Sequence, residues 1–320
     1  MQSLPKSTTY VADRPAPVRR RRATAKWVTI ISFLAPELIV YVLLVLVPIG
    51  QAVYFSLYRW NGLGGLTDFR GVSNYLRLFR DDVFISTIWH NLVFVALSIC
   101  IQLPLALGLA LIIGRNLPGR TFFRLVFFMP FVLAEVIAAV IWSYMFRPDV
   151  GLVNLILRGI GLDFLALSWL GDTSTVLLAV FVVITWKYFG FHMIMYVAAL
   201  QSIPHEIEEA ACIDGATDLQ VIRHITIPMI ASTIRMSIFF SVVGALQVFD
   251  LVWVLTSGGP AHASETMAVY LIKQGFQRLS VGYGSAVAVV MFLMCLVFSL
   301  AYQRIVMRRD LEGGVTSIGG

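Results

Sequence analysis

Six long apolar stretches dominate this sequence, and they restrict the chain to very few folds. They cover approximately residues 28–52, 89–113, 122–146, 174–200, 232–256 and 283–305. Each is long enough to cross the hydrocarbon core of a bilayer, which takes about 20 residues. Backbone groups in lipid must be paired internally, and the stretches lack the alternation of barrel strands. The sequence therefore predicts an all-α integral membrane protein with six transmembrane helices.

The composition agrees with a chain surrounded by lipid. It is 58% hydrophobic and only 13% charged, whereas soluble domains carry roughly 25% charged residues. The net charge of +6 could indicate nucleic acid, but the basic residues flank the apolar stretches, where they face anionic lipid. We therefore expect membrane lipid, and no nucleic acid, as a partner. Cys100, Cys212 and Cys295 share no metal-ligand spacing, so we expect small core residues without disulfides.

The two ends of the chain set the predicted domain boundaries and orientation. Residues 1–26 are polar and end near the run Arg19–Arg22. The next apolar stretch exceeds the roughly 7–15 residues of a signal-peptide core and lacks a cleavage site, so we expect an uncleaved first span. Basic residues are commoner in the tails and in the second-to-third and fourth-to-fifth connections than elsewhere, which places both termini in the cytoplasm. The expected domains are a disordered basic tail (1–26), a transmembrane domain (27–307) and a C-terminal tail (308–320).

The connection between the fourth and fifth stretches, residues 201–230, carries the most specific pattern. Ser202 and Pro204 form a helix start, acidic residues follow closely, and Gly215 favours a turn before a second short helix. One interpretation is an amphipathic connector lying on the bilayer surface. The first helix lacks the Lys/Arg-rich face of such helices. It is better suited to the groove of a partner protein.

Several residues of this connection have a fixed spacing. Glu209, Ala210 and Ala211 are followed after three residues by Gly215, and after nine more by Ile225, Thr226, Ile227 and Pro228. This arrangement resembles the EAA motif of ABC importer permeases, departing from it only by Ile227 where the family has Leu. Residues 71–78, 89–91, 249–250 and 258–260 are similar to the carbohydrate-uptake branch, which includes the maltose and glycerol-phosphate permeases. The resemblance covers most of residues 27–307.

The resemblance implies a function and a set of partners. In that family the loop is a cytoplasmic coupling helix that docks on the ATPase, so the implied coupling residues are Glu209, Ala210, Ala211, Gly215, Ile225 and Pro228. The implied protein is a permease subunit of a binding-protein-dependent ABC importer in the bacterial inner membrane, which translocates a sugar or oligosaccharide. Its implied partners are a second six-span permease, two ATPase subunits and an extracytoplasmic solute-binding protein.

Catalytic motifs are absent from the sequence. It contains no Gly-Lys-Ser/Thr phosphate loop, no HExxH and no GxSxG. We therefore expect a transport subunit that is not an enzyme and binds no cofactor, with ATP and Mg²⁺ held by the partner ATPase.

Charged residues inside the apolar stretches are costly in lipid and indicate a cavity or a partner. Apart from the arginines near the ends of the stretches, they are Glu37, Glu135, Lys187 and Asp250. For Lys187 and Asp250 two interpretations stay open: a substrate cavity between the fourth and fifth spans, and a buried structural ion pair. Glu37 and Glu135 are interpreted as structural.

A sugar site needs hydrogen-bonding groups and aromatic faces. The fourth and fifth spans offer both, and the related sugar permeases contact substrate from these two spans. The candidate substrate-binding residues are Trp186, Lys187, Tyr188, Phe191, Gln247 and Asp250.

Three rival functions remain at this stage. An importer of the same kind could carry a polyol or glycerol phosphate. An ion-driven secondary transporter could use Glu135, Lys187 and Asp250 as ion sites, although it leaves the EAA-like loop unexplained. A membrane enzyme or receptor is disfavoured by the missing catalytic motifs.

Overall fold

The computed structural model describes residues 18–114 and 119–307, with side chains from residue 30 onward. Within these ranges the regular elements are helices, apart from one isolated β-bridge between Tyr58 and Phe69. Four helices are long and apolar enough to cross a membrane, or up to six if each of two bent helix pairs counts as one span. The predicted all-α membrane class is confirmed. Residues 1–17 and 308–320, predicted as parts of the tails, lie outside the described residues.

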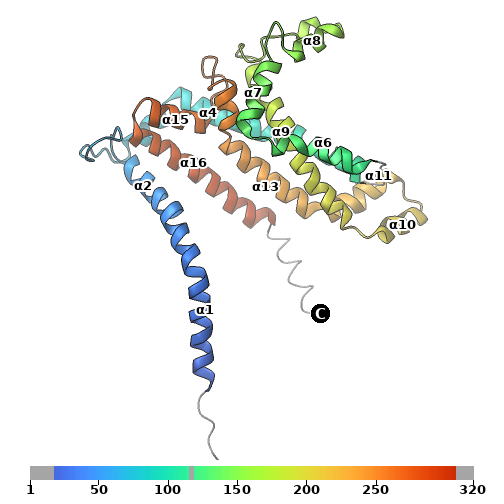
Figure 1. Cartoon of the computed structure of the whole chain (residues 1–320), viewed down its shortest axis with the longest axis horizontal. Coiled ribbons are helices and arrows are strands. Elements are labelled where there is room, and N and C mark those ends of the chain that lie inside the picture. Colours follow the sequence, from blue (N-terminus) through green and yellow to red (C-terminus); the bar gives the residue numbers. More distant parts are fainter. Residues whose placement is uncertain (1–17, 115–118, 308–320) are drawn as a thin grey trace, which may run out of the picture. The chain divides into compact units, whose positions relative to one another are not determined.

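The first unit of the chain extends to Gln51. Its continuous helix, drawn in blue in Figure 1, consists of α1 (Val18–Tyr41), the π-helical η1 (Val42–Leu46) and α2 (Val47–Ser56). The candidate span within it is Ile30–Ser56, close to the predicted 28–52. The helix begins at Val18, inside the tail that was predicted to be disordered, because arginine is a good helix former.

The second unit begins at Ala52 and contains the remaining helices. They are α3 (Ser73–Leu78), α4 (Asp82–Leu97), η2 (Ser98–Gln102), α5 (Leu103–Gly114), α6 (Arg120–Val132), α7 (Glu135–Met145), α8 (Leu152–Gly159), η3 (Asp163–Leu165), α9 (Val176–Gln201), α10 (His205–Ile213), α11 (Asp218–Val221), η4 (Ile222–Thr226), α12 (Ile227–Met229), α13 (Ala231–Gln247), α14 (Asp250–Leu255), α15 (Met267–Ile272), η5 (Lys273–Gln277), α16 (Val281–Tyr302) and η6 (Gln303–Met307).

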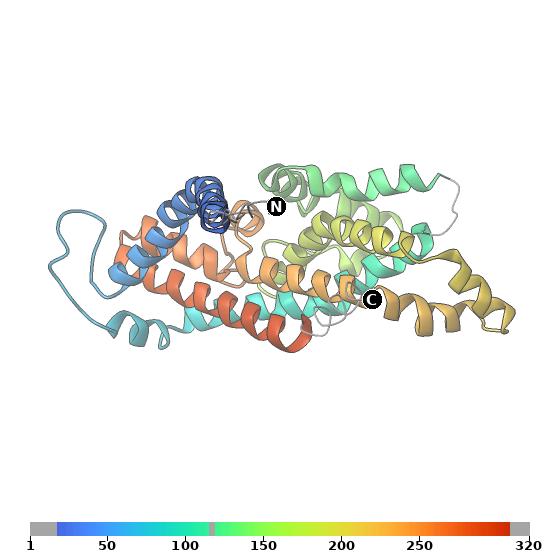
Figure 2. The same ribbon diagram turned by 90° about the horizontal axis from the view of Figure 1, so that it is seen from below.

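Helix α9 is the central helix of this second unit. It packs against α5 through Met193, Tyr196 and Val197, and one of the apolar clusters joins it to α7 and α14. Figure 2 shows α13 running beside α16, which agrees with their shared apolar cluster. Helix α6 crosses α9 at Gly190, where a Cβ would lie 1.9 Å from the Phe127 carbonyl oxygen. Because only glycine leaves room for this approach, Gly190 fixes how closely the two helices pack.

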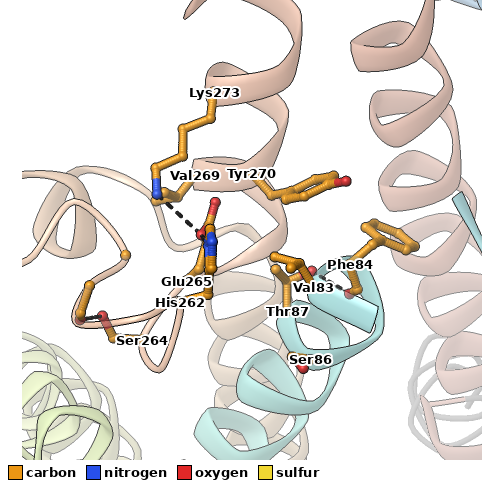
Figure 3. A network of polar contacts seen from close by, with 12 residues as sticks. Val83, Phe84, Ser86, Thr87, His262, Ser264, Glu265, Val269, Tyr270 and Lys273 are labelled. Atoms are coloured by element: carbon orange, nitrogen blue, oxygen red, sulfur yellow. Dashed lines mark hydrogen bonds and ion pairs between the residues drawn. The ribbon is translucent and has the colours of Figure 1, made fainter. Parts of the chain in front are cut away.

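A buried polar cluster holds the segment that connects α14 to α16 (Figure 3). The Glu265 side chain is 1% exposed, and its Oε2 accepts a hydrogen bond from Lys273 Nζ at 3.1 Å and also contacts His262. The Glu265 backbone oxygen lies 2.8 Å from His90 Nδ1, so the cluster reaches α4. A buried carboxylate needs such polar partners. His262 and Lys273 come from the same segment as Glu265, and the His90 contact connects that segment to the sequence-distant α4.

Asp81 caps the start of α4 and extends this region of polar contacts. Its carboxylate accepts from the backbone amides of Val83 and Phe84 and from the Tyr270 hydroxyl at 2.7 Å. Burial raises the pKa of Asp81, but the hydrogen bonds from Tyr270 and the two amides together outweigh it and hold the pKa below its ordinary value. Asp81 therefore stabilises α4 as an anion and joins it to α15.

Three details differ from the sequence prediction. The third apolar stretch, 122–146, is not one helix, because α6 ends at Val132 and α7 begins at Glu135. The fifth, 232–256, is not one helix either, because α13 ends at Gln247 and α14 begins at Asp250. The prediction of small core cysteines is wrong for Cys100 and Cys212, which are exposed. Cys100 lies on the exposed face of η2, within an apolar span. Cys212 lies on the short helix α10, which has no buried residue.

The close crossing at Gly190 generates a stability prediction. Gly190→Ala forces a Cβ against the Phe127 carbonyl, and overpacking of this kind costs about 3 kcal/mol at the upper end of its usual range. We expect a clearly lower apparent Tm in detergent, measured by the tryptophan fluorescence of the purified chain. Gly108→Ala in α5 is the matched control, because no atom lies within 4 Å of its added Cβ. Equal melting of the two variants would contradict the packing argument.

Candidate functional site

A cavity of about 340 Å³ lies where α6, α7, α9 and α13 approach one another. Its size is within the range of about 300–1,000 Å³ that is usual for small-molecule sites. The walls are formed by Ser98, Gln102, Phe131, Glu135, Ile184, Tyr188, Phe191, His192, Phe240, Ser241, Gly244, Ala245, Gln247, Val248, Phe249 and Asp250. Two of these walls come from places where a helix is interrupted.

The first interruption separates α6 from α7, whose axes differ in direction by 99°. The end of a helix leaves carbonyl oxygens without partners inside the helix. Lys187 supplies the missing hydrogen-bond donor. Its Nζ donates to Leu133 O at 2.6 Å and lies 3.4 Å from the carbonyl oxygens of Pro130 and Phe131. The Lys187 residue is only 2% exposed. Its ammonium group therefore stabilises the bend.

The second interruption separates α13 from α14. Asn91 Nδ2 donates to Ala245 O at 2.7 Å, and Thr266 Oγ1 donates to Val248 O at 2.9 Å. Asn91 Oδ1 in turn accepts from the backbone amide of Met267 at 3.0 Å. The carbonyls released by the break are thus paired by side chains from α4 and from the residue before α15. This is how an irregular backbone can persist at membrane depth.

The polar groups of the cavity are held in place by short contacts. The Tyr188 hydroxyl donates to Glu135 Oε1 across the cavity wall. His192 Nδ1 lies 2.7 Å from Ser237 Oγ, which also accepts from the Tyr196 hydroxyl at 2.8 Å. These contacts orient hydrogen-bonding groups without filling the cavity.

Aromatic rings form the apolar part of the same walls. Phe131 and Phe191 are stacked with centroids 4.9 Å apart and an interplanar angle of 21°. Phe240 meets Phe191 edge-on, and Tyr188 meets Phe131 edge-on. Flat rings beside hydrogen-bonding groups can hold a ligand that has both apolar faces and hydroxyls.

The structure brings together four of the six predicted substrate-binding residues. Tyr188, Phe191, Gln247 and Asp250 line the cavity, whereas Trp186 and Lys187 do not. Trp186 packs edge-on against Trp142. Lys187 is occupied with the α6–α7 carbonyls, and no ion pair joins it to Asp250. A role in substrate binding stays a prediction for all six.

The sequence prediction missed several residues of the cavity. Glu135 was interpreted as structural, yet it lies on the wall beside Tyr188. Phe131, Phe240 and Ser98 were not singled out, because isolated aromatic or hydroxyl residues in an apolar stretch carry no signal of their own. The signal available for Glu135 was its charge at membrane depth.

The predicted coupling residues occupy one compact segment. Glu209, Ala210 and Ala211 lie on α10, and Gly215 follows it with φ +83°, a conformation that favours glycine. A capping box of Thr217 and Gln220 begins the next helix, α11. The segment then continues into η4 and α12, which contain Ile225 and Pro228 respectively.

A hydrogen bond within this segment connects two of its helices. Thr226 Oγ1 donates to Glu208 Oε1 at 3.1 Å, which joins α10 to η4. The segment also exposes apolar groups, with Ile213 85% and Leu219 73% exposed. Exposed apolar side chains beside an acidic helix favour contact with a partner protein.

Interrupted helices around a polar and aromatic cavity are typical of membrane transporters. Comparison with known proteins places the chain more closely. Residues 102–310 match the family described as the binding-protein-dependent transport system inner membrane component. The chain belongs to this family of non-enzymatic permease subunits of ABC transporters. The resemblance noted from residues 209–228 is thereby confirmed.

Individual relatives cover nearly the whole chain. The probable ABC transporter permease protein YurN of Bacillus subtilis is 37% identical over 270 residues, which is 84% of this chain and 92% of YurN. The diacetylchitobiose uptake system permease protein NgcF of Streptomyces coelicolor is 33% identical over 300 residues, 90% of this chain and 85% of NgcF. A bacterial alginate ABC transporter, solved in complex with an alginate pentasaccharide-bound periplasmic protein, has a similar structure. The match has a TM-score of 0.77 at 25% sequence identity and covers 91% of this chain and 97% of the alginate transporter chain.

The pairing of carbonyls at the α6–α7 bend can be tested by mutation. Lys187→Met keeps an unbranched side chain that reaches Cε but removes the donor, and each buried carbonyl left unpaired costs about 1–3 kcal/mol. We expect a lower apparent Tm and faster proteolysis near residues 130–135. Thr185→Val, on the same helix, is the control, because Thr185 Oγ1 is buried without a partner. A Lys187→Met protein as stable as Thr185→Val would exclude a structural role for this ammonium group.

Proposed function

We propose that this chain translocates a sugar or oligosaccharide across the bacterial inner membrane as the permease subunit of an ABC importer. The observation that carries this proposal is the cavity between two interrupted helices, where stacked aromatic rings and hydrogen-bonding groups face the same space. Sugars present apolar ring faces and many hydroxyls, which suit such walls. The relatives NgcF and the alginate transporter, both named for saccharides, support this cargo class.

The proposed mechanism is alternating access. A solute-binding protein delivers the sugar to the outer face, and the spans reorient around the cavity when the partner ATPases close on ATP. The α6–α7 bend and the α13–α14 break lie in the cavity walls, so small changes at either one alter access to it. ATP and Mg²⁺ belong to the partner subunits in this proposal.

The finer architecture follows from the same proposal. We propose six spans, with the bent pair α6–α7 forming the third and α13 belonging to the fifth, and both termini in the cytoplasm. Helix α10 and the Gly215 turn act as the coupling helix, docked on an ATPase through Glu209, Ala210 and Ala211. The exposed Ile213 and Leu219 support such a contact. A second six-span permease and two ATPase subunits complete the importer.

An ion-driven secondary transporter is no longer a comparable alternative, because the chain belongs to a family of binding-protein-dependent permeases. Two of its three proposed ion sites are also engaged in other contacts. Lys187 faces the carbonyls of the bend, and Glu135 is paired with Tyr188.

The coupling assignment predicts the behaviour of two variants. Gly215→Pro introduces a residue that cannot adopt the positive φ of this turn, and Glu209→Lys reverses a charge on the docking surface. We expect both proteins to insert normally but to co-purify with less than about one tenth of the wild-type amount of ATPase, a loss typical of a damaged interface. Asp163→Lys, a charge reversal on an exposed residue of the connection before α9, is the control. Wild-type recovery of ATPase with both variants would refute the assignment.

The transport function is tested with the complete importer, purified through a tag on this chain and placed in liposomes. Addition of the binding protein, a radiolabelled sugar and internal ATP should give accumulation that stops without ATP. Equal accumulation without ATP, driven by a proton or sodium gradient, would contradict the proposal.

A further inference from the structure

The cavity carries negative charge on this chain and no positive charge. Two carboxylates, Glu135 and Asp250, line it, while the described residues contribute no Lys or Arg side chain to its walls. Lys187 is the nearest cation in sequence, but its Nζ is directed to the backbone oxygens of the α6–α7 bend. The wall therefore presents two carboxylates to the cavity, while the Lys187 ammonium group is turned to the backbone oxygens of the bend.

The two carboxylates are able to contact cargo. Glu135 uses one oxygen to accept from the Tyr188 hydroxyl, which leaves its second oxygen available. Asp250 is exposed toward the cavity, and no contact within the described part of the chain occupies its carboxylate. An ionised carboxylate only accepts hydrogen bonds. Both groups therefore favour ligands that bring donors, such as sugar hydroxyls.

The remaining polar groups do not compensate this charge. His192 is 4% exposed, and its Nδ1 lies 2.7 Å from Ser237 Oγ, so this ring nitrogen is engaged by a neutral hydroxyl. Gln102, Gln247, Ser98 and Ser241 are neutral. A carboxylate, phosphate or sulfonate on the cargo would meet like charges in a site of low dielectric constant, where repulsion is strong.

We infer that the cargo of this importer carries no negative charge, because Glu135 and Asp250 reject anionic saccharides and accept the hydroxyls of uncharged ones. This inference rests on the proposed function. Family membership does not decide the question, since the similar proteins include one named for diacetylchitobiose and one crystallised with alginate, an acidic polysaccharide. The charge on the cavity walls is what separates the two classes here.

The test compares matched sugars in the reconstituted importer. The probes are radiolabelled diacetylchitobiose, cellotriose and maltotriose, each paired with the uronate made by oxidising its terminal C6 hydroxyl. We expect ATP-dependent accumulation of at least one neutral sugar at about ten times or more the rate of its uronate, the size expected for like-charge rejection. Uronates that accumulate as fast as their neutral partners would overturn the inference while leaving the importer function intact. No ATP-dependent accumulation of any probe would overturn the proposed function and this inference with it.

A second measurement separates these carboxylates from selection by the binding protein. Glu135→Gln with Asp250→Asn removes both charges and keeps the shapes and the acceptor for Tyr188. We expect the uronate-to-neutral rate ratio to rise about tenfold in the double variant, as like-charge repulsion is lost. Asp163→Asn, an exposed carboxylate away from the cavity, should leave the ratio unchanged. An unchanged ratio in the folded double variant, or in Asp250→Asn alone where the double variant does not fold, would overturn the role of these carboxylates.

Discussion

The need to pair every backbone carbonyl in a water-poor environment governs this structure. Uninterrupted helices such as α9 meet it internally, but a cavity at membrane depth requires a change of direction, and each change releases carbonyls. Lys187 pairs those of the α6–α7 bend, and Asn91 with Thr266 pairs those of the α13–α14 break. The cavity walls therefore exist because three polar side chains stabilise irregular backbone.

Much of the fold could be predicted from sequence, because apolar length is a strong and local signal. The stretches at 28–52, 89–113, 174–200 and 283–305 correspond to Ile30–Ser56, Asp82–Gly114, Val176–Gln201 and Val281–Met307. The break near Val248 could not be predicted in this way. No Pro or Gly marks it, and Asn91, which stabilises it, is 154 residues away from the carbonyl that it pairs.

The candidate site was predictable to a similar extent and for the same reason. Aromatic and polar residues on the fourth apolar stretch were visible, and Tyr188 and Phe191 do line the cavity. The direction of a long side chain is set by its surroundings, however, so charge at membrane depth could not separate the roles of Lys187 and Glu135. Lys187 turns to the end of α6, and Glu135 turns to the cavity. Helix α9 connects this cavity to the loop before α10, about 15 Å further along at 1.5 Å per residue from Phe191 to Gln201.

The close approach at Gly190 also has a mechanical meaning. A backbone carbonyl of Phe127 rests against the Cα of Gly190 with no side chain between them. Such a contact can act as a pivot. Sliding α6 along α9 would bring the Phe127 carbonyl against neighbouring side chains, whereas rotation of α6 about Gly190 keeps the contact. Phe131 lies about one helical turn from this contact on α6, whereas Glu135 lies beyond the 99° bend and is joined to α9 by the Tyr188 hydroxyl. A rotation of α6 about Gly190 therefore displaces the Phe131 and Glu135 parts of the wall differently.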